Sequence, residues 1–159
     1  MINNEVLKRI RYILSLNEEK LLEIFEAADS PVSPGQLNSW FAKDGADDYQ
    51  KINDFELVTF LDGLINVKRG KKEGAQPEPE KKITNNIILR KLKIAFDMKN
   101  DEVLEVLDLD GFQISKHELS ALFRKKDHKH FRVCKDEVLI HFLTGLKIRH
   151  RDSETPVEK

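Results

Sequence analysis

Two eleven-residue stretches decide the fold of this chain: residues 54–64 read DFELVTFLDGL, and residues 136–146 read DEVLIHFLTGL. The identical pairs are Asp54/Asp136, Leu57/Leu139, Phe60/Phe142, Leu61/Leu143, Gly63/Gly145 and Leu64/Leu146. At the same offset of 82 residues, segment 3–70 aligns with segment 85–152 without a gap and with 16 identities in 68 positions. These identities fall on apolar stripes, helix caps and a glycine within a helix, which a fold constrains. The pattern therefore predicts an internal duplication.

The duplication divides the chain into a first repeat (1–70), a charged linker (71–84), a second repeat (85–152) and a C-terminal tail (153–159). Residues 70–82 read GKKEGAQPEPEKK, which is rich in glycine, proline and charge and offers almost nothing to bury. Such a composition is typical of a linker.

Each repeat shows four amphipathic segments, which predict an all-α fold of two tandem four-helix domains. In the first repeat, the first helix is expected from the Asn pair at 3–4 to about Leu16. In the second repeat, it is expected from the Asn pair at 85–86 to about Met98. The second covers about 18–27 and its counterpart around 103–107. The third begins after Ser33 or Ser115, and the fourth covers 53 or 54 to about 69, and about 136 to 149.

Local signals mark where these helices begin. Ser33 with Gln36, and Ser115 with Glu118, have the spacing of capping boxes, in which each side chain satisfies a free backbone donor of the other residue. Pro34 stands at the first helical position. The pairs Ile52/Leu57 and Cys134/Leu139 are spaced as hydrophobic staples, so we expect Cys134 to be structural. Gly63 and Gly145 lie within a helix, where glycine is costly, and this indicates close helix contact.

The composition is that of a globular protein. Apolar residues make up 40% of the chain and charged residues 35%. The single cysteine excludes an intramolecular disulfide and agrees with a reducing compartment. The first residues lack the features of a signal peptide, and no apolar run is long enough for a membrane span. These features predict a cytoplasmic protein with no membrane partner.

Candidate catalytic and metal-binding residues have simpler structural interpretations. All five histidines lie in the second repeat, at 117, 128, 130, 141 and 150, but none form an HExxH pattern and no CxxC pair accompanies them. Two carboxylate pairs recur in both repeats. Glu23 and Glu105 are expected on the solvent face of a helix, and Asp54 and Asp136 are expected at the start of a helix, where a carboxylate caps the backbone amides. No nucleophile elbow or glycine-rich phosphate loop occurs. We therefore expect no enzyme, no cofactor and no metal site.

Basic residues on the first helix of each repeat give the main functional signal. Three positions keep their positive charge across the duplication: Lys8, Arg9 and Arg11 correspond to Arg90, Lys91 and Lys93. At helical spacing they cover about 160° of one surface, opposite the apolar stripe. The simpler interpretation is an ordinary solvated face, and the alternative is a face that contacts phosphates.

The two repeats also differ in charge. Segment 3–70 holds 8 Lys and Arg against 12 Asp and Glu, whereas segment 85–152 holds 14 against 11. Arg124, Lys125 and Lys126, followed by Lys129, His130 and Arg132, stand where the first repeat has Asp44, Asp47 and Asp48. An acidic and a basic repeat could bind each other, within one chain or between two, or the basic repeat could present its surface to nucleic acid.

The second and third helices of the second repeat, joined through residues 111–114, have the order and lengths of a helix-turn-helix. Its third helix offers Lys116, His117 and Ser120, which are few base-reading side chains. Contact with phosphates is therefore a better expectation than sequence-specific reading.

The second repeat resembles the bacterial YehS-like family. The resemblance rests on Asn85-Asn86, Asp127-His128-Lys129, Phe131-Arg132, Cys134, Asp136 and the segment Phe142-Leu143-Thr144-Gly145-Leu146. It extends over the whole chain and implies a small bacterial cytosolic protein. The family is one of unknown function, so it supplies no site residues.

Taken together, the sequence predicts a non-catalytic binding or adaptor module. The preferred partner is nucleic acid, whose phosphates the basic helix face and residues 124–126 would contact. The alternative is a module for protein–protein interaction or self-association without nucleic acid.

Overall fold

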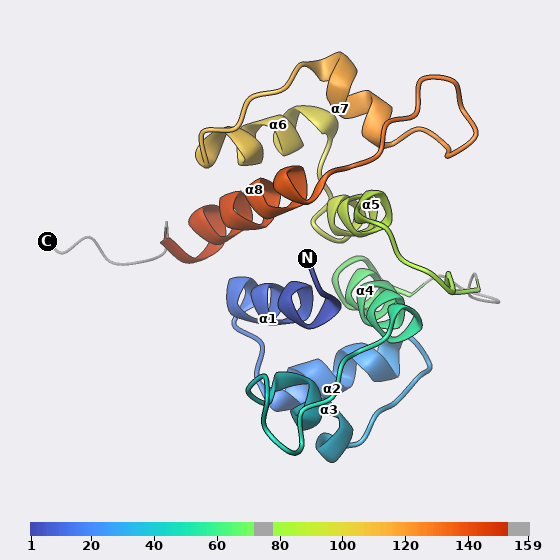
Figure 1. Cartoon of the computed structure of the whole chain (residues 1–159), viewed down its shortest axis with the longest axis vertical. Helices are drawn as coiled ribbons and strands as arrows, with labels where there is room; N and C mark the ends of the chain where they lie inside the picture. The colour runs from blue at the N-terminus through green and yellow to red at the C-terminus, as the bar shows by residue number, and fades with distance from the viewer. Residues whose placement is uncertain (72–77, 153–159) are drawn as a thin grey trace, which may run out of the picture. The chain divides into compact units, whose positions relative to one another are not determined.

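The computed structural model describes residues 1–71 and 78–152, and within these ranges every regular element is a helix. The chain forms two compact units, Met1–Ile83 and Thr84–Lys159. The first contains α1 (Asn3–Leu14), α2 (Glu18–Ala27), α3 (Pro34–Phe41) and α4 (Asp54–Arg69) (Figure 1). The second contains α5 (Asn85–Ala95), α6 (Asn100–Leu109), α7 (Lys116–Leu122), α8 (Asp136–Lys147) and a π-helical turn, η1 (Ile148–Asp152). The predicted all-α duplication is confirmed.

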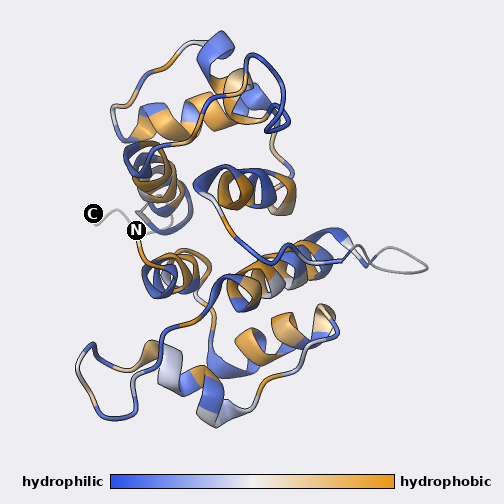
Figure 2. Ribbon diagram, turned by 45° about the vertical axis from the view of Figure 1, so that its right-hand side comes forward, coloured by the Kyte–Doolittle hydropathy of each residue, from blue (hydrophilic) through white to orange (hydrophobic). Residues whose placement is uncertain are grey.

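Each repeat has a core built from the apolar side of its helices, and the long α3–α4 and α7–α8 loops are mostly hydrophilic (Figure 2). In the first repeat, the rings of Phe25, Trp40 and Phe60 are almost fully buried, and the Phe25 ring centroid lies 5.5 Å from each of the other two. The second repeat places Leu107, Leu122 and Phe142 at the equivalent positions, all of them buried. The two cores therefore share positions but differ in side-chain volume.

In each repeat, two helices approach each other closely at a glycine. A Cβ atom built on Gly63 of α4 would lie 1.9 Å from the backbone oxygen of Ile24 in α2. A Cβ atom on Gly145 of α8 would lie 2.0 Å from the backbone oxygen of Val106 in α6. The absence of a side chain thus lets the two helices of each pair touch at the backbone, as the retained glycines predicted.

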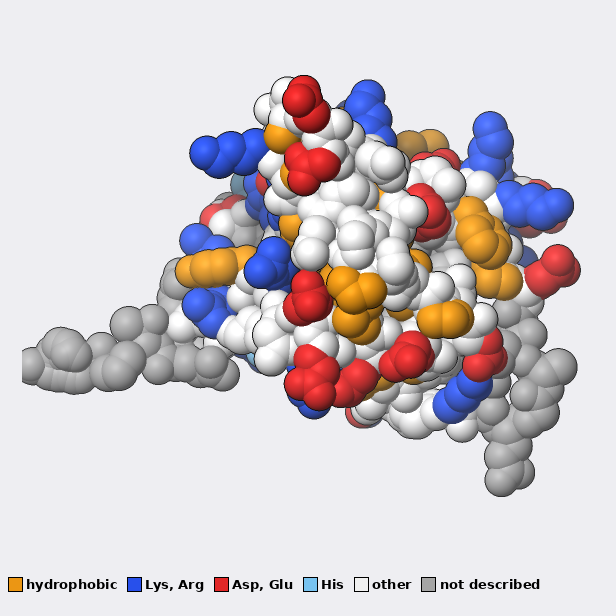
Figure 3. Space-filling view, turned by 90° about the horizontal axis from the view of Figure 1, so that it is seen from below, with side chains coloured by type: hydrophobic (Ala, Val, Ile, Leu, Met, Phe, Trp, Pro, Cys, Tyr) orange, Lys and Arg blue, Asp and Glu red, His pale blue; other side chains and the backbone are white. Residues whose placement is uncertain are grey.

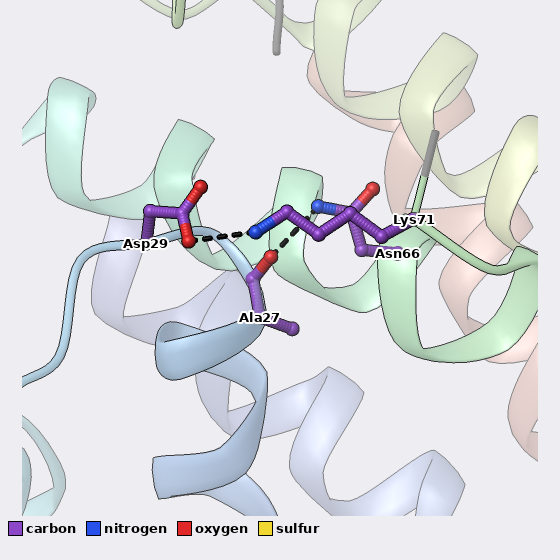
Figure 4. A network of polar contacts seen from close by, with 4 residues as sticks. All are labelled: Ala27, Asp29, Asn66 and Lys71. Carbon is purple, nitrogen blue, oxygen red and sulfur yellow. Dashed lines mark hydrogen bonds and ion pairs between the residues drawn. The ribbon is translucent and has the colours of Figure 1, made fainter. Parts of the chain in front are cut away.

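Polar contacts join the C-terminal ends of α2 and α4 (Figure 4). Asn66 Nδ2 donates to the backbone oxygen of Ala27 at 2.8 Å, and Lys71 Nζ lies 2.6 Å from Asp29 Oδ1. The second repeat lacks these residues and instead joins the end of α6 to α8 through Asp110 and His141, whose Oδ2 and Nδ1 atoms are 2.7 Å apart. The same helix pair is therefore fastened differently in the two repeats.

An asparagine pair holds the loop before the last helix of each repeat. Asn4 Nδ2 donates to the backbone oxygens of Trp40 and Gln50, and its Oδ1 accepts from the Ile52 amide. Asn3 Nδ2 donates to Ile52 O and to Asp54 Oδ1.

Every one of these bonds recurs in the second repeat. Asn86 binds Leu122 O, Arg132 O and the Cys134 amide, and Asn85 binds Cys134 O and Asp136 Oδ1. The duplication of Asn3, Asn4 and Asp54 as Asn85, Asn86 and Asp136 is therefore explained by the structure of this loop.

Several predicted helix ends need correction. α1 and α5 stop at Leu14 and Ala95, two to three residues earlier than expected, because Ser15 and Asp97 adopt left-handed φ angles of 54° and 53°. The last helix of the second repeat leaves α-helical geometry after Lys147, where η1 begins.

The two predicted capping boxes have different outcomes. The box of Ser115 and Glu118 is complete, with both reciprocal bonds present. Ser33 Oγ accepts from the Gln36 amide, but the Gln36 side chain donates to Gln50 Oε1 at 3.1 Å, so only half of the predicted box forms. Competition from the neighbouring loop thus replaces the second bond.

Parts of the predicted linker and tail, residues 72–77 and 153–159, lie outside the described residues. Among the residues that are described, no helix is both long and apolar enough to cross a membrane.

Candidate functional site

The loop between the third and fourth helices forms equivalent backbone hydrogen bonds in the two repeats. In the second repeat, the amides of His128, Phe131 and Arg132 donate to the backbone oxygens of Lys125, His128 and Ala121. The first repeat repeats these bonds at the equivalent positions, from Ala46, Tyr49 and Gln50 to Lys43, Ala46 and Ser39. Together with the asparagine bonds, these turns give the two loops one common path, and the α7–α8 loop projects from its repeat (Figure 1).

The side chains on this common scaffold have opposite charges. We call residues 124–132 the basic loop, because it holds five Lys or Arg and one Asp: Arg124, Lys125, Lys126, Asp127, Lys129 and Arg132. These side chains are all exposed. The equivalent segment, 42–50, holds one Lys and three Asp, and we call it the acidic loop. On the face of the molecule in Figure 3, acidic side chains are spread from the top to the lower middle, and Lys and Arg side chains lie mostly toward the edge.

The predicted basic helix face is largely occupied by contacts within each repeat. Of its six residues, Arg11 is exposed and the other five are half-buried. Arg9 Nε lies 2.9 Å from Glu5 Oε2. Arg11 stacks over the ring of Phe41 at 4.7 Å, and Lys93 Nζ lies 4.5 Å from the centroid of Phe123. Burial lowers the pKa of Lys93 below the ordinary value of a lysine.

Arg11 and Lys93 are equivalent positions, and so are Phe41 and Phe123, so the duplication preserves a cation–π pair. The conserved positive charge at this position therefore has a structural role that the sequence analysis missed. The signal was available in the identical Phe41/Phe123 pair. The same contact places Lys93 against Phe123, which directly precedes the basic loop in the sequence, whereas Lys8, Arg9 and Arg11 belong to the other repeat.

Three histidines gather at the basic loop. His117 of α7 and His130 have ring centroids 6.2 Å apart, and the rings of His128 and His130 are 5.5 Å apart. All three side chains are exposed. Within the described part of the chain, no group of three or more His, Cys, Asp or Glu residues is arranged to hold a metal ion.

The other two histidines lie elsewhere in the second repeat. His141 stacks on Phe112 with the ring centroids 4.4 Å apart and contacts Asp110, and His150 packs against Phe96. The repeated carboxylates also have partners that fit a structural role. Glu23 lies 3.9 Å from Lys20, Glu105 lies 3.7 Å from Arg149, and Asp54 and Asp136 accept from the Asn pairs.

Cys134 follows the basic loop in the sequence and is buried, and its amide donates to Asn86 Oδ1. Burial, aided by the negative charge of Asp136, raises the pKa of the Cys134 thiol from 9.0 to about 11. Since the thiolate is the reactive form, alkylation by iodoacetamide at pH 8 should be at least about 100-fold slower than in urea. Equal rates in the native and the unfolded protein would show that this thiol is accessible.

The helix-turn-helix order is present, with α6 and α7 joined through Gly111, which has a left-handed φ of 74°. α7 is only seven residues long. Its Lys116 lies 3.6 Å from Asp101, and Glu118 closes the capping box with Ser115, whose hydrogen bonds lower the pKa of that carboxyl group. The helix therefore presents few donors to a base edge.

The structure thus defines a class of all-α proteins with two repeats, each of which carries a loop held by an asparagine pair. The chain belongs to the family described as Protein of unknown function (DUF1456), whose model matches residues 3–70 and 85–152. It is 41% identical over 150 residues to the "Uncharacterized protein YehS" of Escherichia coli (strain K12), covering 94% of this chain and 96% of that protein. No solved structure matches the chain.

Proposed function

We propose that this protein is a non-catalytic binding module whose second repeat contacts nucleic-acid phosphates through the basic loop. The observation that carries the proposal is the common loop scaffold with opposite charges. The acidic loop follows the same path with three aspartates, and only Lys125 has a basic counterpart there, Lys43. The fold therefore does not require the other four cations of residues 124–132. A function other than folding explains their presence.

The positions of these cations suit a polyanionic partner. Arg124, Lys125, Lys126 and Lys129 are exposed on one short loop, where each cation that neutralises a phosphate releases a condensed counterion. Lys93, which lies against Phe123, extends this surface onto α5. Contacts of this kind position a protein on nucleic acid without reading its sequence.

The test is fluorescence anisotropy with labelled oligonucleotides at several salt concentrations. The variant Lys125→Gln/Lys126→Gln/Lys129→Gln should lose affinity for all sequences alike. Each lost contact should lower the slope of log affinity against log salt by about 0.7 to 0.9. The matched control, Lys20→Gln/Lys43→Gln/Lys51→Gln, removes the same charge from exposed positions of the first repeat and should bind as the unchanged protein does.

Binding that the basic-loop variant retains in full, or no binding at low salt, would contradict the proposal. A second candidate function, self-association, is favoured by the acidic loop, because its three aspartates complement the basic loop of another copy. A protein that binds no oligonucleotide but sediments as a larger species at low salt, and as a monomer at high salt, would support that candidate instead.

A further inference from the structure

The three histidines around the basic loop have no counterpart in the first repeat. Gly35, Ala46 and Asp48 occupy the positions of His117, His128 and His130. The scaffold therefore forms without imidazole rings, and their grouping on the second repeat is specific to it. The turn from Phe131 N to His128 O brings a further ring to the end of the same loop.

We propose that the basic loop takes single-stranded nucleic acid, with the rings of His117, His128 and His130 serving as a surface on which unpaired bases stack. This inference rests on the proposed function and names its substrate class. Every base has a π-face that stacks on aromatic or imidazole rings without regard to sequence. In a duplex these faces are already covered by neighbouring base pairs, so the exposed rings would contribute nothing there.

The arrangement of rings and cations fits an extended strand. The ring centroids are separated by 5.5 and 6.2 Å, and His128 and His130 alternate with Lys129 along the loop. A strand that crosses this surface meets cations at its phosphates and rings at its bases. This combination of a positive track and stacking side chains is the general basis of single-strand binding.

The structure disfavours the alternative in which α7 enters the groove of a duplex. The helix has seven residues, its Lys116 is directed to Asp101, and the Glu118 carboxylate lies at its N-terminal end. Hydrogen bonds from Ser115 lower the pKa of Glu118 and keep it negative, which repels a phosphate approaching that end. The exposed loop remains as the surface that a nucleic acid can reach.

The experiment compares a labelled thymidine 12-mer with a duplex of the same length, using the full chain at pH 8. We expect the single strand to bind at least about ten times more tightly than the duplex. His128→Ala/His130→Ala should weaken single-strand binding by about ten-fold or more and leave duplex binding unchanged.

His128→Tyr/His130→Tyr supplies the control, because it keeps a ring at each position and should preserve single-strand affinity. Circular dichroism should show that both variants fold, since the two side chains are exposed. Equal affinity for strand and duplex, an unchanged alanine variant, or a tyrosine variant as weak as the alanine variant would each overturn this inference while the proposed function stands. Binding to neither oligonucleotide would overturn the proposed function itself.

Discussion

Gly63→Ala should lower the free energy of unfolding of the first repeat by roughly 3 kcal/mol, although alanine is the better helix former by about 1 kcal/mol. The added methyl group would lie 1.9 Å from the Ile24 backbone oxygen, and backbone cannot move aside as a flexible side chain can. α2 and α4 must therefore separate. Urea unfolding followed by the fluorescence of Trp40, the single tryptophan and a fully buried one, reports on this repeat.

Gly145→Ala should have a similar effect on the second repeat, where the Val106 backbone oxygen would be 2.0 Å away, and calorimetry should record it. Gly35→Ala is the matched control. Its new Cβ would approach nothing closer than Ser33 Oγ at 3.9 Å, so stability should stay the same or rise slightly. A stabilised Gly63→Ala or Gly145→Ala variant would refute the close-contact role of these glycines.

Asn86→Ala should unfold the second repeat or bring it close to unfolding. The substitution leaves Leu122 O, Arg132 O and the Cys134 amide without their partner. The bonds to Leu122 O and the Cys134 amide are buried, and unpaired buried groups cost about 1 to 3 kcal/mol each. A domain of this size has a total stability of only about 3 to 10 kcal/mol. A thermal melt by circular dichroism, combined with the alkylation rate of Cys134, should record the loss.

Asn85→Ala provides the comparison within the same pair. Asn85 is half-buried, and its bonds to Cys134 O and Asp136 Oδ1 are closer to solvent, where water can replace the lost donor. We expect a cost of about 1 kcal/mol. If Asn86→Ala were no more destabilising than Asn85→Ala, the loop would not depend on the buried side chain.

The sequence was sufficient to predict the architecture, because its signals are local and occur twice. Periodic apolar positions, the Ser115 cap and the recurring glycines each specify a helix, its start or its contact. Helix ends were less accurate at Ser15 and Asp97, since left-handed φ angles are usually associated with glycine or asparagine. The η1 turn gave no sequence signal.

The candidate site was only partly predictable, because its geometry depends on contacts distant in sequence. Charge counts alone identified Arg124, Lys125 and Lys126, which the structure leaves exposed. The same counts could not show that Lys93 lies against Phe123, or that Asn86 reaches a backbone amide 48 residues away. A retained charge can serve folding or binding, and only the three-dimensional partner separates the two.

The asparagine-held loop also bears on how a duplicated protein acquires a new role. Asparagine side chains on α1 or α5 and backbone turns hold the path of this loop. Its exposed side chains therefore contribute little to folding. The exposed residues of such a segment can change while the fold stays the same. One copy can exchange aspartates for lysines and histidines while the other keeps its own chemistry, and neither has to be redesigned. Duplication followed by divergence at this one segment gives a single chain two chemically distinct surfaces.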